Sequence, residues 1–231
     1  FDDFMRLLSP SANEMLGLLS ERAAQLKRMY FGKTIRIFGP LYISNYCMND
    51  CRYCGFRRSN KFERRRLSFE ETLAEAQVIH DWGIDSLLLV TGEDPKAISV
   101  DFMERLVKEL KHSFSYIGIE VYPMDEDSYR RLRVAGVHGL TIFQETYDKE
   151  IYSQLHPSGP KRDYQNRIDA MARGAKAGFF NLGHGALLGL YDWRSEAMSM
   201  AAHALWLRKN FWRSRNQFSF PRITPAVGGF Q

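Results

Sequence analysis

Residues 40–54 read Pro-Leu-Tyr-Ile-Ser-Asn-Tyr-Cys-Met-Asn-Asp-Cys-Arg-Tyr-Cys, an apolar run that leads straight into three cysteines. Six strand-like stretches occur along the chain, at residues 35–43, 86–90, 116–122, 139–143, 181–188 and 217–221. Helical patterns precede or separate them, at about 11–30, from 69 onward, and at 100–112, 125–135, 163–177 and 193–210. Strands that alternate with helices are joined by crossover connections, so the sequence predicts an α/β fold with a parallel sheet.

Two architectures fit this alternation, an open doubly wound sheet and a (β/α) barrel of the TIM type. In both, functional side chains gather at the carboxyl ends of the strands, and the cysteines follow the first strand. About six strand-helix units are fewer than the eight of a closed barrel. We therefore expect an N-terminal helical leader over residues 1–34 and an incomplete barrel core over 35–231, with its C-terminal part missing. The chain opens on Phe1 and stops at Gln231, and both ends look cut.

The three cysteines are the most specific feature of the chain. Cys47, Cys51 and Cys54 form the pattern C-x3-C-x2-C, and the chain has no other cysteine. Three thiolates are one short of a closed tetrahedral zinc site, whereas a 4Fe-4S cluster held by three cysteines keeps one iron open for an external ligand. None of the six histidines forms an H-x3-H pair or lies near a cysteine in the sequence, so no histidine is assigned as a ligand. A zinc site completed by a distant histidine, or a chance grouping of thiols, remains the alternative.

Composition limits the partners and the location of the protein. The net charge is +5, and much of it comes from one run beside the cysteines, Arg57, Arg58, Lys61, Arg64, Arg65 and Arg66. A nucleic-acid-binding surface would spread such residues over a face with aromatic side chains among them, so we expect no nucleic-acid partner. No apolar run is long enough to span a membrane, and the N-terminus lacks the apolar core of a secretory signal. With no cysteines left for a disulfide framework, these features predict a cytoplasmic protein with no membrane association.

Several segments together resemble one known family. They are residues 40–45 (PLYISN), 53–56 (YCGF), 89–93 (LVTGE), 144–147 (QETY), 156–161 (HPSGPK), 185–190 (GALLGL) and 219–222 (SFPR). With the cysteine pattern, they resemble the radical S-adenosylmethionine (radical SAM) superfamily, its aromatic amino acid lyase branch, and within that branch the 2-iminoacetate synthase family of tyrosine lyases. The resemblance covers nearly the whole chain. It implies a radical SAM barrel with a 4Fe-4S cluster on the three cysteines and S-adenosyl-L-methionine as second cofactor.

The resemblance also implies roles for five residues outside the cysteines. Tyr53 would lie against the adenine of S-adenosyl-L-methionine, and Gly92 and Glu93 would receive its methionine ammonium group. Glu145, at the end of an apolar strand, would bind the ribose hydroxyls or the ammonium, and Arg167 would bind the carboxylate through its bidentate fork. All five are expected to be cofactor-binding residues.

The activity implied by the resemblance is cleavage of the Cα–Cβ bond of L-tyrosine. The products would be 2-iminoacetate (dehydroglycine), used to build the thiazole of thiamine, and p-cresol. Expected partners are this small-molecule substrate, an electron donor such as flavodoxin or ferredoxin, and the thiazole synthase. Two related enzymes remain alternatives, the tyrosine lyase of FeFe-hydrogenase maturation and a tryptophan lyase of the same branch. Outside the enzymes, the alternative is a zinc-stabilised basic nucleic-acid-binding module.

Overall fold

The computed structural model describes residues 1–226 and 228, which form two compact units, Phe1–Ile37 and Phe38–Gln231. The first unit contains helix α1 (Asp2–Leu7), the 3-10 helix η1 (Pro10–Met15) and helix α2 (Leu16–Phe31). The single helix expected over about 11–30 is therefore wrong at its start. Pro10 opens a 3-10 turn that runs to Met15, and the α-helix begins only at Leu16. No helix in the described residues is long and apolar enough to cross a lipid bilayer.

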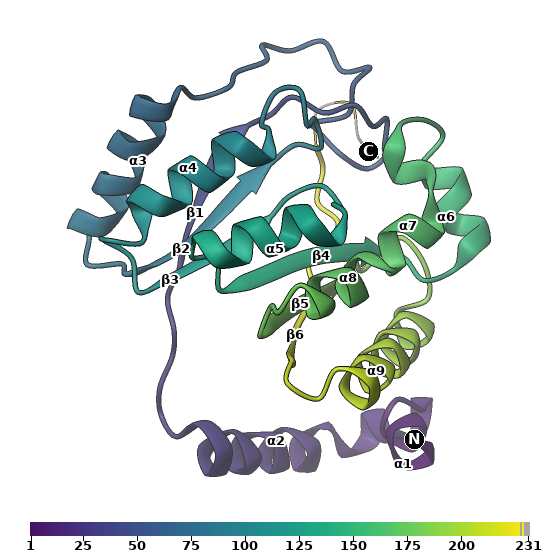
Figure 1. The fold of residues 1–231 in the computed structure, drawn as a ribbon. Helices are drawn as coiled ribbons and strands as arrows, with labels where there is room; N and C mark the ends of the chain where they lie inside the picture. Colours follow the sequence, from purple (N-terminus) through teal and green to yellow (C-terminus); the bar gives the residue numbers. More distant parts are fainter. Residues whose placement is uncertain (227, 229–231) are drawn as a thin grey trace. The chain divides into compact units, whose positions relative to one another are not determined.

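The second unit is built on a parallel sheet of six described strands (Figure 1). These are β1 (Gly39–Ser44), β2 (Ser86–Thr91), β3 (Tyr116–Glu120), β4 (Gly139–Glu145), β5 (Asn181–Ala186) and β6 (Arg215–Ser219). Each strand pairs with the next along the chain, in the order β1-β2-β3-β4-β5-β6. A doubly wound sheet reverses its strand order at a switch point, whereas a barrel adds strands in sequence. The predicted α/β fold of an incomplete TIM-type barrel is therefore confirmed.

Helices connect the strands of this sheet, and Figure 1 shows α3, α4 and α5 side by side along one of its faces. Ser68 and Glu71 make both hydrogen bonds of a capping box, which starts the first of these helices at Phe69 as predicted. The bounds are α3 Phe69–Asp81, α4 Val100–Leu110, α5 Glu126–Ala135, α6 Lys149–Leu155, η2 Pro160–Arg162, α7 Tyr164–Ile168, α8 Ala170–Lys176 and α9 Trp193–Asn210.

The core lies between the sheet and these helices. Alternate strand residues point to opposite faces of a sheet, and one set here is fully buried, including Leu87, Leu89, Ile117, Ile119 and Leu140. They pack with helix side chains into one hydrophobic cluster. The residues between them point to the other face, which is the inner face of the incomplete barrel.

The structure corrects three predicted elements. The first strand begins at Gly39 instead of residue 35, because Gly39 pairs with Leu87 at the start of β2 and the preceding residues have no neighbouring strand. The helix expected over 163–177 is interrupted at Asp169, which separates α7 from α8. The predicted order also lacked α6, whose first turn is capped by the Asp148 side chain.

Candidate active site

The three cysteines lie on the loop that follows β1, at the carboxyl end of the sheet. The backbone N–H of Met48 donates to the Glu93 carbonyl at 3.1 Å, which ties this loop to the segment after β2. On the other side, the N–H of Arg52 donates to the Leu155 carbonyl at 3.0 Å at the end of α6. The cysteine loop is thus held between two segments that are distant in the sequence.

The thiols of this loop are chemically suited to an iron–sulfur cluster. All three are free, and burial raises the pKa of Cys51 to about 12 and raises that of Cys54. Metal binding would displace these protons, because the thiolate is the ligand. The Cys54 sulfur also accepts a hydrogen bond from the Phe56 N–H at 3.4 Å, the type of contact that tunes cluster potentials.

The thiols are not arranged around a single ion. Within the described residues, no group of three or more His, Cys, Asp or Glu side chains is placed to hold one metal ion. A cluster binds each thiolate to a different iron, so its ligands stand farther apart than those of a mononuclear zinc site. The residues present therefore fit a cluster better than a zinc ion.

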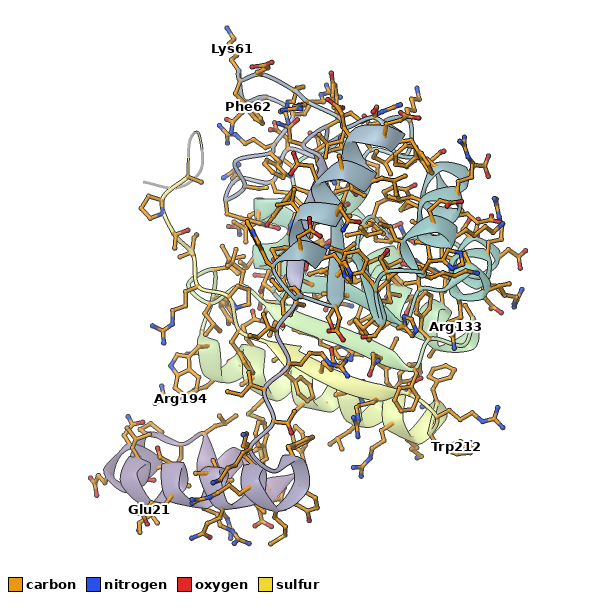
Figure 2. All side chains as sticks on the ribbon, turned by 90° about the vertical axis from the view of Figure 1, so that its left-hand side faces the viewer. Glu21, Lys61, Phe62, Arg133, Arg194 and Trp212 are labelled. Atoms are coloured by element: carbon orange, nitrogen blue, oxygen red, sulfur yellow. The ribbon has the colours of Figure 1, made fainter. Side chains whose placement is uncertain are left out.

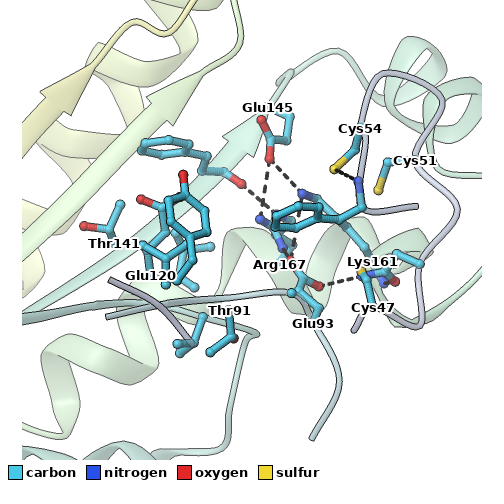
Figure 3. Close-up of a pocket in the computed structure, with 18 residues that line it drawn as sticks. Cys47, Cys51, Cys54, Thr91, Glu93, Glu120, Thr141, Glu145, Lys161 and Arg167 are labelled. Atoms are coloured by element: carbon cyan, nitrogen blue, oxygen red, sulfur yellow. Dashed lines mark hydrogen bonds and ion pairs between the residues drawn. The ribbon is translucent and has the colours of Figure 1, made fainter. Parts of the chain in front are cut away.

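A pocket of about 190 Å³ opens beside the cysteines (Figure 3). The three cysteines line it together with residues from the carboxyl ends of β1 to β4. Four charged side chains also line it, Glu93, Glu145, Lys161 and Arg167. The predicted gathering of functional side chains at the strand ends is present in the structure.

Glu93 is at the centre of this charged group. Its carboxylate accepts hydrogen bonds from Arg167 Nη1 at 2.7 Å and from Asn49 Nδ2 at 2.8 Å, and Lys161 Nζ lies 3.8 Å away. Burial alone would raise the pKa of Glu93, but the two cations and these hydrogen bonds outweigh it and hold the pKa below its usual value. Glu93 is therefore an ionised carboxylate in a buried place.

Glu145 completes the group from the end of β4. Its carboxylate accepts a hydrogen bond from Lys161 Nζ at 2.7 Å and lies 3.8 Å from Arg167 Nη2. Its backbone has φ = 72°, unusual for a residue other than glycine, and the β4–β5 register shifts between Phe143 and Glu145. Strain and bulges of this kind cluster at functional sites, where they aim a side chain.

Arg167 enters the pocket from α7. Besides its bond to Glu93, its Nε donates to the Phe143 carbonyl at 2.6 Å, and the side chain is only 5% exposed. Burial and mutual repulsion with Lys161 oppose the charge of each cation. The carboxylates of Glu93 and Glu145 prevail, so the pKa values of both Arg167 and Lys161 are raised. Two carboxylates and two cations thus form a balanced buried set.

Tyr53 lies behind the pocket and is absent from the described residues that line it. Its hydroxyl is 2.8 Å from His156 Nε2, while His156 Nδ1 is 2.7 Å from the Tyr152 carbonyl. A carbonyl can only accept, so His156 Nδ1 carries the proton and the Tyr53 hydroxyl donates to Nε2. Burial, with the neighbouring Lys161 charge, lowers the pKa of His156 to about 3, which keeps it neutral. The contact of Tyr53 with an adenine stays a prediction.

Gly92 lies against the cysteine loop. A Cβ at this position would collide with the backbone carbonyl of Tyr46, and the Gly92 N–H donates to the Ser44 carbonyl at 2.8 Å. Only glycine allows this approach of two backbones. The expected approach of Gly92 to a ligand stays a prediction.

Sequence reasoning missed three residues of the site, Asn49, Lys161 and Glu120. Lys161 lies in a Pro-Gly loop, where lysine usually faces solvent, but it is 9% exposed here. Asn49 bridges two parts of the site, because its amide donates to Glu93 and its Oδ1 accepts from the Lys161 N–H at 2.8 Å. For Glu120, the available signal was an acidic residue inside an otherwise apolar strand pattern.

The basic run beside the cysteines divides into structural and exposed residues. Arg64 donates to the carbonyls of Asn45, Phe56 and Arg57, so it holds the loop together. Lys61 is exposed and projects from the loop with Phe62 (Figure 2). The run is therefore not a uniform charged surface.

Known proteins are similar to this chain over its whole length. The sequence matches the Radical SAM superfamily over residues 41–201. It is 40% identical over 231 residues to the 2-iminoacetate synthase of Salmonella typhimurium and 41% identical to that of Escherichia coli. All of this chain is aligned, and it spans 61% of the length of each relative. Among solved structures, HydG, a maturase of the FeFe-hydrogenase, matches with a TM-score of 0.92 at 34% identity, over 96% of this chain and 50% of that one.

Proposed function

We propose that this chain, which belongs to the radical SAM superfamily, carries the cofactor-binding part of an enzyme that cleaves L-tyrosine to 2-iminoacetate and p-cresol. The observation that supports this most is the combination of three free thiols and a balanced charged group around one pocket. The identity of about 40% to two 2-iminoacetate synthases supports the reaction and the substrate. Thiamine thiazole biosynthesis would then be the pathway and the cytoplasm the location.

In this proposal, Cys47, Cys51 and Cys54 hold a 4Fe-4S cluster, and S-adenosyl-L-methionine binds beside it. When bound, the two cofactors supply the one-electron radical chemistry that cleavage of a carbon–carbon bond needs. The chain itself binds and orients. The cysteine loop fixes the position of the cluster through its backbone bonds to the segment after β2 and to the end of α6.

The charged group suits the zwitterionic methionine part of S-adenosyl-L-methionine. Glu93 offers a carboxylate to its ammonium group, and Arg167 offers two donors in a planar fork to its carboxylate. Glu145 is assigned to the ribose hydroxyls or the ammonium, as the family resemblance implies. Lys161 holds Glu145 ionised and in place. Tyr53 is assigned to the adenine, with its hydroxyl anchored by His156.

The further partners in this proposal are an electron donor such as flavodoxin or ferredoxin and the thiazole synthase. Reduction of the cluster requires a one-electron donor, and thiazole assembly requires a consumer for 2-iminoacetate. The substrate is a small molecule, and L-tyrosine is preferred over L-tryptophan because of the relatives named above.

The test is anaerobic turnover after reconstitution of the cluster with iron and sulfide. The protein is mixed with S-adenosyl-L-methionine, a reductant and either L-tyrosine or L-tryptophan, and 5′-deoxyadenosine, p-cresol and 2-iminoacetate are quantified. Formation of p-cresol that depends on L-tyrosine and on all three cysteines supports the proposal. Products from L-tryptophan alone, or no 5′-deoxyadenosine with either amino acid, would refute it.

The likeness to HydG favours one second candidate, the tyrosine lyase of FeFe-hydrogenase maturation. The family resemblance implies the same first steps for both, with a second iron–sulfur site only in the maturase. Iron and sulfide in the reconstituted protein distinguish the two. More than about four irons per chain would favour the maturase, because three cysteines account for one cluster.

A further inference from the structure

Glu120 is the last residue of β3 and lies in the wall of the pocket. In the parallel register it is opposite Val90 on β2 and Thr141 on β4. Ile117 and Ile119 of the same strand are buried in the helix-covered core, so the alternation of the strand turns Glu120 to the inner face of the barrel. Figure 3 shows Glu120 and Thr141 near one another in the pocket with the three cysteines.

The Glu120 carboxyl has no protein partner. Among the described residues it makes no hydrogen bond or ion pair, although it is half-buried. Thr141 beside it also makes no side-chain hydrogen bond to the described residues. Glu93 and Glu145 differ, because Arg167, Lys161 and Asn49 satisfy both of them. The charges of these four side chains cancel, so Glu120 is the uncompensated acid of the pocket.

The position of Thr141 is set by the neighbouring strand. A Cβ at Gly183 on β5 would lie 2.5 Å from Thr141 Oγ1, so only glycine leaves room for that hydroxyl. The wall therefore presents a carboxyl and a hydroxyl on adjacent strands, both free to bind a ligand. A carboxylate beside a hydroxyl is complementary to a cationic group with several N–H donors.

From this arrangement we infer that Glu120 binds the ammonium group of the amino-acid substrate and takes one proton from it. This inference rests on the proposed function, because that function supplies the substrate. L-tyrosine carries one cation, its ammonium group, and Thr141 would accept a second N–H of the same group. Glu120 is then a catalytic residue that touches the substrate.

The hydrogen count of the proposed reaction requires such a base. The ammonium nitrogen of L-tyrosine carries three hydrogens, whereas the imine nitrogen of 2-iminoacetate carries one. One of the two that leave is the hydrogen atom removed by radical chemistry, and the other leaves as a proton. In the step assigned to Glu120, an N–H bond breaks, its electron pair stays on nitrogen, and the proton forms an O–H bond with the carboxylate. The substrate becomes a neutral amine and Glu120 a neutral acid.

The environment of Glu120 matches this role. Burial raises its pKa to about 7, with a further rise from Glu145 and opposing effects from Lys161 and Arg167. Tyr42, on β1, is the other titratable group that senses it, and its own pKa is raised by burial and by Glu120. An ordinary glutamate is far too weak a base for an α-amino group of pKa about 8, whereas a pKa near 7 brings the two within roughly one unit. Glu120 is ionised, and able to accept the proton, above about pH 7.

Binding of two ligands to Glu120→Gln tests the contact directly. The ligands are L-tyrosine and 3-(4-hydroxyphenyl)propanoate, which lacks the amino group, and affinity is measured by calorimetry on the reconstituted protein with S-adenosyl-L-methionine. The variant should bind L-tyrosine roughly ten- to a hundredfold more weakly, as expected for loss of a charged hydrogen bond. It should bind the propanoate and S-adenosyl-L-methionine as tightly as the parent. An equal loss for both ligands, or a loss of cofactor affinity, would overturn the inference.

Turnover supplies the second measurement. In the parent, p-cresol formation should rise with pH through about 7 as Glu120 ionises. Glu120→Gln should form 5′-deoxyadenosine with little p-cresol, whereas Glu109→Gln, on the exposed side of α4, should behave as the parent. A Glu120→Gln protein that forms p-cresol at the parental rate with the parental pH profile would refute the role. If the parent forms no p-cresol, the proposed function fails, and the binding comparison still decides whether Glu120 contacts an ammonium group.

Discussion

Arg167→Met is the substitution that most directly tests the buried charged group. It removes the donors to the Phe143 carbonyl at 2.6 Å and to Glu93 at 2.7 Å, and a cation 3.8 Å from Glu145. Lys161 remains 3.8 Å from Glu93 and Asn49 still donates to it, but one positive charge is lost from a set of two. Removal of one partner from a buried ion pair usually costs about 3–5 kcal/mol. The expected loss in the free energy of unfolding is therefore about 3–5 kcal/mol at pH 7.

The assay is urea unfolding of the protein without cofactors, followed by circular dichroism at pH 7 and pH 5. Arg130→Met is the matched control, because Arg130 pairs with Glu126 and Asp127 on an exposed helix face with half of its side chain in solvent. Exposed pairs contribute about 1 kcal/mol or less, so the control should change little.

The pH dependence follows from Glu93. In the parent its pKa is depressed, so its contribution to stability is present above the pKa of the unfolded chain and is lost as pH falls through the folded value. Without Arg167 the same buried carboxylate would protonate at higher pH, which relieves the uncompensated charge. The destabilisation by Arg167→Met should therefore shrink from pH 7 to pH 5.

A double variant isolates the pair. If Arg167 and Glu93 are coupled as described, Arg167→Met with Glu93→Gln should lose less than the sum of the two single variants. The reasoning would be refuted if Arg167→Met cost no more than the exposed control Arg130→Met. It would also be refuted if the two single losses were additive.

Two further predictions concern the cysteine loop. Cys51→Ala should prevent assembly of a stable cluster, and iron analysis with the absorbance near 400 nm after anaerobic reconstitution checks it; about four irons per chain with a parental spectrum would contradict the assignment. Tyr53→Phe should lower the free energy of unfolding by about 1–3 kcal/mol, because it leaves the buried His156 Nε2 without its donor. Urea unfolding beside an exposed control, Tyr191→Phe, measures this loss, and equal midpoints for parent and Tyr53→Phe would show that the hydrogen bond contributes nothing.

The sequence was sufficient to predict the sheet and the end of it that carries the site. Apolar strands alternate with capped helices, and crossover connections force such strands to be parallel, so polar residues that follow different strands must converge. Glu93 and Arg167 are 74 residues apart and were both assigned to the pocket, where they form an ion pair. Their location followed from topology and resemblance, whereas their mutual pairing did not.

The missed residues depend on contacts that no local pattern encodes. Lys161 is buried because its loop folds over the strand ends, where the Tyr152 hydroxyl donates to its carbonyl at 2.6 Å. The positive φ of Glu145 arises from the bulge between β4 and β5, which only the pairing of the two strands determines. The strand start at Gly39 likewise depends on where β2 begins. Burial and register are tertiary properties, and a single sequence specifies them only through its partners.

The contact of Gly92 with the cysteine loop makes two binding events interdependent. The loop and the segment after β2 share the bonds from Gly92 to Ser44 and from Met48 to Glu93, so the backbone that carries the thiols and the backbone that carries Glu93 are ordered together. A group bound by the thiols restricts the motion of Glu93, and a ligand held by Glu93 restricts the motion of the thiols. Thermodynamic reciprocity requires each to strengthen the binding of the other by the same factor. The two cofactors of such a protein would thus bind cooperatively, with one glycine as the point of mechanical coupling.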